Sequence, residues 1–129
     1  MTALYFRLTI EDAGRFRRSR DVGSYFGLVP KQQDSGESTP QLRISKAGDE
    51  GARRLLVNCA HYIVGPFGPD SDVRRWGLKL AARGGKNAKK RAIVAVARKL
   101  AVLLHRLWAT GEVYEPLRNS HRAEKAVAA

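Results

Sequence analysis

The serine at position 35 is the residue whose neighbours in the sequence best fit a chemical role. Ser35 precedes Gly36 in a polar stretch between two short β-type segments. Three cations stand close to it in sequence, at Lys31, Arg43 and Lys46. A hydroxyl is a poor nucleophile unless a base or stabilisation of negative charge assists it, and these cations could neutralise an attacked phosphodiester. The alternative is ordinary turn chemistry, because Asp, Ser and Gly dominate turns for conformational reasons.

A second basic group opens the longest expected helix and consists of Lys86, Lys89, Lys90 and Arg91. Lysines at a helix N-terminus interact unfavourably with the helix dipole, so their presence there calls for an explanation. Binding of a phosphate would explain them, since the unpaired N–H groups there also favour an anion. A solvated basic face is the alternative.

The overall charge points in the same direction. The 129 residues carry 24 Lys and Arg against 12 Asp and Glu, a net charge of +12. Such a field attracts polyanions, chiefly nucleic acid. Arginine pairs such as Arg53-Arg54 would contact phosphates rather than read bases, which gives salt-sensitive and sequence-tolerant affinity. Each pair, taken alone, could also be a solvated face.

Several other classes of protein are not expected. The best apolar run, Ala92 to Ala97, meets Arg98 long before a membrane span is complete, and the start of the chain does not look like a signal peptide. The single cysteine, Cys59, cannot form an internal disulfide. No histidine spacing or acidic cluster suggests a metal site, so we expect no cofactor in this chain. A cytoplasmic protein without a membrane partner is predicted.

The hydrophobic pattern predicts a mainly α fold, a compact helical domain with one small β-hairpin over Lys31 to Lys46. The expected helices run from Asp12 to Arg18, from Ser19 to Phe26, from Asp49 to Val64, from Asp70 or Ser71 to about Gly84, and from Asn87 to Thr110. The last has a broad apolar surface, which predicts a central helix packed on more than one side. Residues 1–116 would form one domain and residues 117–129 a disordered tail.

A set of short motifs runs along the chain: Arg15-Phe16-Arg17, Tyr25 to Pro30, Ser35-Gly36, Arg43 to Asp49, Arg53 to Leu56, Gly84 to Asn87, Ala95 to Leu100 and Gly111 to Tyr114. In these motifs the chain closely resembles the C-terminal domain of insertion-sequence transposases of the 110/116/902 group, which are DEDD-type, RNA-guided DNA recombinases. The motifs follow one another in order and cover nearly all of the chain up to about Pro116.

The resemblance implies a catalytic role for one residue and indicates which molecules the chain would bind. In that family the C-terminal domain is taken to provide a serine that forms a covalent phosphoserine link to DNA, and the matching residue here is Ser35. A RuvC-like N-terminal domain would supply four acidic ligands for Mg²⁺, and it is missing from this chain. We therefore expect a truncated transposase, inactive alone, whose partners are DNA, a guide RNA, and further copies or full-length transposase.

The sequence is also compatible with two other functions. The chain could be a nucleic-acid-binding module without catalysis that modulates full-length transposase. It could also be a small ribosome-associated RNA-binding protein, which fits the charge but leaves the Ser-Gly pair unexplained.

Overall fold

The computed structural model describes residues 2–30 and 44–128, and these residues form six α-helices and one 3-10 helix. The helices are α1 (Thr2–Ile10), η1 (Ala13–Arg15), α2 (Asp21–Tyr25), α3 (Glu50–Val64), α4 (Asp72–Ala81), α5 (Ala88–Thr110) and α6 (Arg118–Ala128). The prediction of a mainly α fold is confirmed. None of the described helices is both long and apolar enough to cross a bilayer.

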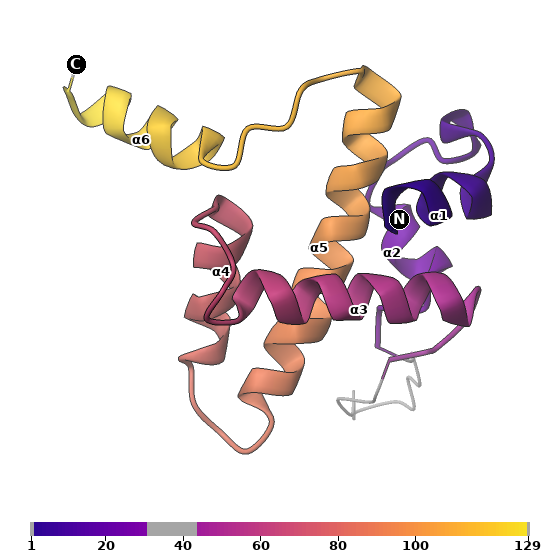
Figure 1. Cartoon of the computed structure of the whole chain (residues 1–129), viewed down its shortest axis with the longest axis horizontal. Coiled ribbons are helices and arrows are strands. Elements are labelled where there is room, and N and C mark those ends of the chain that lie inside the picture. The colour runs from indigo at the N-terminus through magenta and orange to yellow at the C-terminus, as the bar shows by residue number, and fades with distance from the viewer. Residues whose placement is uncertain (1, 31–43, 129) are drawn as a thin grey trace, which may run out of the picture.

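Helix α5 is the axis of the molecule (Figure 1). It packs against α3, which crosses it, against α4 along one part of its length, and against α2 near another. Helix α1 rests mainly on α3. The expectation of a central helix packed on more than one side is thus confirmed, and it accounts for the width of the apolar surface of α5.

The helix ends follow local capping chemistry. The side chain of Asp49 accepts a hydrogen bond from the Ala52 N–H at the start of α3, and Ser71 accepts one from the Arg74 N–H at the start of α4. Helix α5 ends at Gly111, whose φ of 71° is the left-handed conformation that glycine adopts without steric cost. These starts and this stop agree with the sequence prediction.

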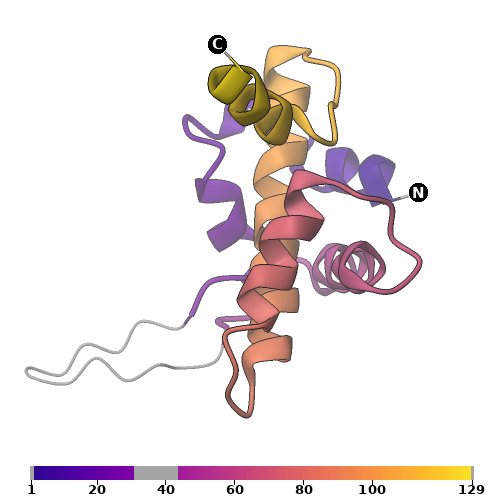
Figure 2. The same ribbon diagram turned by 90° about the vertical axis from the view of Figure 1, so that its left-hand side faces the viewer.

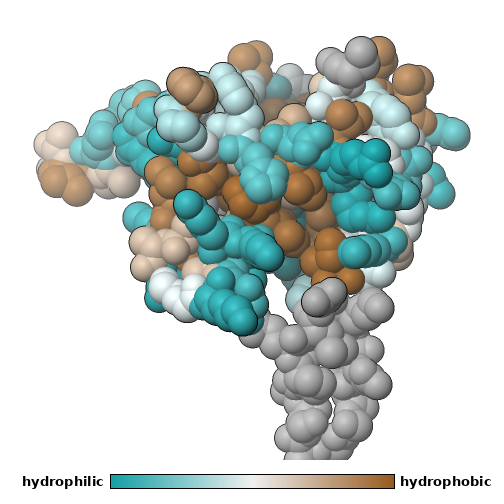
Figure 3. Space-filling view, turned by 60° about the horizontal axis from the view of Figure 1, so that its bottom comes forward, coloured by the Kyte–Doolittle hydropathy of each residue, from teal (hydrophilic) through white to brown (hydrophobic). Residues whose placement is uncertain are grey.

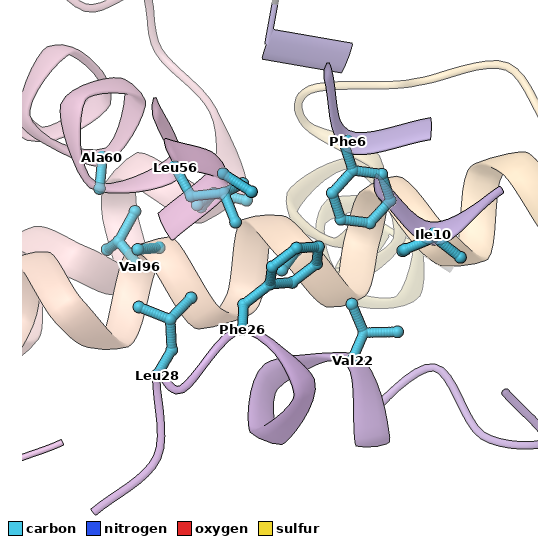
Figure 4. Packing of buried hydrophobic residues seen from close by; sticks show 12 residues of the cluster. Phe6, Ile10, Val22, Phe26, Leu28, Leu56, Ala60 and Val96 are labelled. Carbon is cyan, nitrogen blue, oxygen red and sulfur yellow. The ribbon is translucent and has the colours of Figure 1, made fainter. Parts of the chain in front are cut away.

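The core lies where α1, α2, α3 and α5 meet (Figure 4). Phe6 of α1 packs on Phe26, which follows α2, with ring centroids 5.3 Å apart. Leu56 from α3 and Val96 from α5 complete this cluster, and both are almost fully buried. Burying an aliphatic or aromatic side chain of this size stabilises the fold by about 1.5–3 kcal/mol, so the cluster holds α2 firmly against α5.

A buried histidine is the feature of the core that sequence reasoning missed. His105 of α5 is 2% exposed. Its two ring nitrogens lie 2.8 Å from the Ser19 hydroxyl and 2.8 Å from the Ala13 carbonyl oxygen. Because the carbonyl can only accept, Nε2 donates to Ala13, and Nδ1 forms its hydrogen bond with the serine hydroxyl. His105 therefore fastens the loop before α2 to α5.

Three predicted segments differ in the structure or lie outside the described residues. The helix expected from Asp12 to Arg18 is only a short 3-10 helix, Ala13–Arg15. Residues 117–129 were expected to be a disordered tail, whereas Arg118–Ala128 form α6, which extends from the rest of the molecule beside the start of α4 (Figure 1). Most of the predicted hairpin, residues 31–43, lies outside the described residues. Within those that are described there is no strand, and one isolated antiparallel bridge joins Pro30 to Ile44.

Candidate functional site

The two ends of the serine-bearing segment are held side by side in the structure. Ser35, Lys31 and Arg43 themselves lie outside the described residues. The N–H of Ser45 donates to the Val29 carbonyl at 2.8 Å, and the N–H of Lys46 donates to the Gly27 carbonyl at 3.1 Å. We call this pairing of residues 26–30 with residues 44–48 the loop base.

Glycine is required at two positions of the loop base. Gly27 and Gly48 have φ values of 70° and 81°, which other residues adopt only with strain. A Cβ at Gly27 would overlap the backbone of Ala47, and one at Gly48 would overlap the carbonyl oxygen of Tyr25. The two chain segments therefore approach more closely than side chains would allow. This fixes the points where the described chain leaves and re-enters the core.

Arg53 ties the two halves of the loop base together. Its Nη1 lies 3.1 Å from the carbonyl oxygen of Ala47 and 3.4 Å from that of Phe26, and it donates to both. Hydrogen bonds to a charged group are typically worth about 1.5–3 kcal/mol, toward the lower end at the longer distance. Arg53 was predicted as a phosphate contact, and its backbone partners were not foreseen. Its neighbour Arg54 forms an exposed ion pair with Glu50 at 3.1 Å.

Asp49 connects the loop base to the first helix. Besides capping α3, it accepts a hydrogen bond from the Tyr5 hydroxyl of α1 at 3.1 Å. The hydrogen bond from the Ala52 N–H, assisted by that from Tyr5, holds the pKa of Asp49 below its ordinary value, although slight burial opposes the shift. The hydrogen bond that Tyr5 donates to Asp49 raises the pKa of the Tyr5 hydroxyl. The start of α3 is thus an electrostatically favourable place for a carboxylate.

The second predicted basic group lies on the turn between α4 and α5. Lys86, Lys89, Lys90 and Arg91 are all exposed, as the sequence suggested. Among the described residues none of these four side chains forms an ion pair. Asn87, the residue before α5, makes no side-chain cap, and the N–H of Ala88 at the start of the helix donates to the Gly85 carbonyl at 3.3 Å.

One sequence signal shows that this basic region is larger than expected. Residues 73–111 contain eleven Lys and Arg and no Asp or Glu. Lys79 and Arg83, which were not predicted, lie on α4 and just after it and are exposed. Lys99 sits over the ring of Trp76, 4.3 Å from its centroid, a favourable cation–π distance. The uninterrupted run of one charge sign could have revealed this region.

The two basic regions belong to the same end of the molecule. In Figures 1 and 2 the α4–α5 turn and the described chain on either side of residues 31–43 both lie toward the bottom of the view. Seen from that end, hydrophilic side chains surround smaller hydrophobic areas (Figure 3). By contrast α6 lies at the opposite end (Figure 1). A polyanion approaching from below would meet both regions.

The acidic residues near α4 have structural roles. Asp70 binds the Arg75 guanidinium through two hydrogen bonds of 3.0 and 2.7 Å, which hold the pKa of Asp70 below its ordinary value. Asp72 accepts hydrogen bonds from the N–H groups of Asn119 and Ser120 at the start of α6. Among the described residues no three potential metal-ligating side chains come together. Asp70 thus holds Arg75, and Asp72 holds the start of α6.

Comparison with known proteins identifies the family. Residues 1–72 match the model of the transposase IS116/IS110/IS902 family. The transposase for insertion sequence element IS1111A of Coxiella burnetii is 36% identical over 115 residues, which are 88% of this chain and 31% of that protein. A probable family 20 transposase of Pseudomonas aeruginosa is 35% identical over 106 residues, 81% of this chain and 30% of its own length.

The chain therefore belongs to the IS116/IS110/IS902 transposase family. It spans about a third of the length of these two relatives. The resemblance found in the sequence is confirmed at the level of the family, while the role of Ser35 stays a prediction.

Proposed function

We propose that this chain is the DNA-binding, serine-bearing part of a transposase, and that Ser35 is its nucleophile. The Ser35 oxygen would attack a backbone phosphorus and form a phosphoserine ester. The bond from that phosphorus to one deoxyribose oxygen breaks, and the oxygen leaves as a hydroxyl with the proton taken from the serine. Because the number of phosphoester bonds does not change in this step, a second DNA hydroxyl can later attack the phosphoserine. That attack releases the serine hydroxyl and joins a new strand.

The observation that carries this proposal is the loop base. A catalytic group needs a support that limits its freedom, because misplacement by about 1 Å can cost a factor of about 100 in rate. Gly27, Gly48 and Arg53 fix the two ends of the segment that contains Ser35. An ordinary surface turn would not require so close a backbone approach at both ends.

Nucleic-acid binding is proposed for the basic end of the molecule. The contacts would come from Lys46 at the loop base and from Lys86, Lys89, Lys90 and Arg91 at the α4–α5 turn, together with Lys31 and Arg43 beside the serine. Such side chains neutralise phosphates and give affinity that falls steeply with salt. The bound polymer would be DNA, with a guide RNA as a further partner. Acidic metal ligands would come from another part of the transposase assembly.

The test uses a transposase in which this chain replaces the matching 115 residues of the Coxiella burnetii relative. The chimera is incubated with its insertion-sequence DNA, and protein–DNA adducts that survive detergent are counted on a gel. Ser35→Ala should abolish the adduct, while Ser38→Ala, a control three residues away, should leave it. Equal adduct formation by the parent chimera and Ser35→Ala would refute the assignment. Loss with Ser38→Ala alone would move the nucleophile to that residue.

A further inference from the structure

Arg53 differs in its hydrogen-bond partners from its neighbour Arg54 and from the four cations of the α4–α5 turn. A single nitrogen of its guanidinium donates to carbonyl oxygens on both halves of the loop base, those of Phe26 and Ala47. These two carbonyls are 21 residues apart in sequence and flank the whole serine-bearing segment. The side chain itself is half-buried. In a phosphate-binding arginine, by comparison, this nitrogen would be free to contact the phosphate.

We propose that Arg53 is a positioning residue, one that holds the two ends of the segment carrying Ser35 at a fixed separation. Through this link α3 determines where the segment begins and ends. The planar guanidinium suits the task because its donors diverge in a fixed geometry, whereas a lysine is a single point charge on a flexible stem. The catalytic consequence rests on the proposed function of Ser35, but the structural link does not.

The neighbouring arginine offers a matched control. Arg54 follows on the same helix, carries the same charge, and pairs with Glu50 on an exposed surface. Removing either arginine lowers the net charge by one. A difference between the two variants therefore reports the contacts of Arg53 rather than its charge.

The experiment compares Arg53→Lys, Arg53→Gln and Arg54→Gln in the full 129-residue chain. Amide hydrogen exchange is followed at Ser45 and Lys46, whose N–H groups bond to the other half of the loop base. Both Arg53 variants should speed this exchange at least tenfold, with exchange at Val96 in the core unchanged. Arg54→Gln should change neither. Affinity for a DNA duplex, measured by fluorescence anisotropy over a range of salt, should be retained in Arg53→Lys.

The opposite outcome is equally specific. If Arg53 were a phosphate ligand, Arg53→Gln would weaken DNA binding and reduce the salt slope by about one, with Arg53→Lys restoring much of the affinity and exchange unaltered in both. That result would overturn the proposal. In the chimeric transposase, Arg53→Lys should slow adduct formation more than tenfold without changing DNA affinity. Since exchange and affinity do not depend on Ser35, an error in the nucleophile would appear only in the Ser35→Ala experiment.

Discussion

The loop base and the α4–α5 turn lie at the same end of the molecule, and their cations are held in different ways. At the loop base, Arg53 is half-buried and its guanidinium bonds to two backbone carbonyls. At the turn, Lys89 and Lys90 are exposed and without ion pairs among the described residues. Both regions contain glycines with positive φ, but only at those of the loop base would a Cβ atom overlap the backbone of a neighbouring segment.

Residues of equal charge therefore have different structural roles in the two regions. A cation that donates to carbonyls on two segments of its own chain acts on the geometry of that chain. An exposed cation without a partner is available to a phosphate and raises the local potential. Under the proposed function, the loop base would position the serine-bearing segment and the α4–α5 turn would attract the nucleic acid.

Glycine replacement should separate the regions most strongly. Gly27→Ala combines a left-handed backbone with overlap against Ala47, and we expect it to lower the free energy of unfolding by about 3 kcal/mol. Gly84→Ala has a φ of 82° but open space around its Cβ, and should cost only about 1 kcal/mol. Urea denaturation of both variants measures this. Equal losses would show that the close approach at the loop base has no energetic importance.

Charge reversal should affect the α4–α5 turn through binding instead of stability. Lys89→Glu together with Lys90→Glu should lower duplex affinity at least tenfold at moderate salt, and similarly for all sequences, because phosphate contacts carry no base information. The control makes the same charge change on α6 at the other end of the molecule, with Arg122→Glu and Lys125→Glu. A loss confined to one sequence, or an equal loss in the control, would contradict the assignment.

Lowering the pH should produce the smallest difference between the loop base and the α4–α5 turn. The pKa of Asp49 lies below the ordinary 3.8, so its cap is intact above that value and is lost as the pH falls through the lowered pKa. The α4–α5 turn has no carboxylate to titrate. We expect the Ala52 amide chemical shift, followed by NMR, to change below about pH 4, while that of Arg91 stays constant. A transition of Ala52 above pH 5 would contradict the lowered pKa.

Local chemistry made much of the fold predictable. Asp49, Ser71 and Gly111 are residue types whose capping preferences arise within one turn of helix, so the bounds of α3, the start of α4 and the end of α5 could be read from the sequence. The mainly α architecture followed from apolar spacing in the same way. Short-range signals sufficed wherever the partner was near in sequence.

The features that escaped prediction depend on distant partners. Helix α6 has no apolar stripe from which it could be predicted. The N–H groups of Asn119 and Ser120 at its start are capped by Asp72, which lies 47 and 48 residues earlier in the sequence. His105 is satisfied by residues at positions 13 and 19. Arg53 reads as one of many surface cations until Phe26 and Ala47 are brought beside it. Such contacts exist only after the chain has folded.

The most direct test of the account is to identify the residue that becomes linked to DNA. The adduct formed by the chimeric transposase would be digested with protease and nuclease, and the nucleotide-bearing peptide sequenced by mass spectrometry. We expect a phosphodiester on the side chain of Ser35. A nucleotide on Ser38, Ser45 or any residue outside the segment between Pro30 and Ile44 would contradict it.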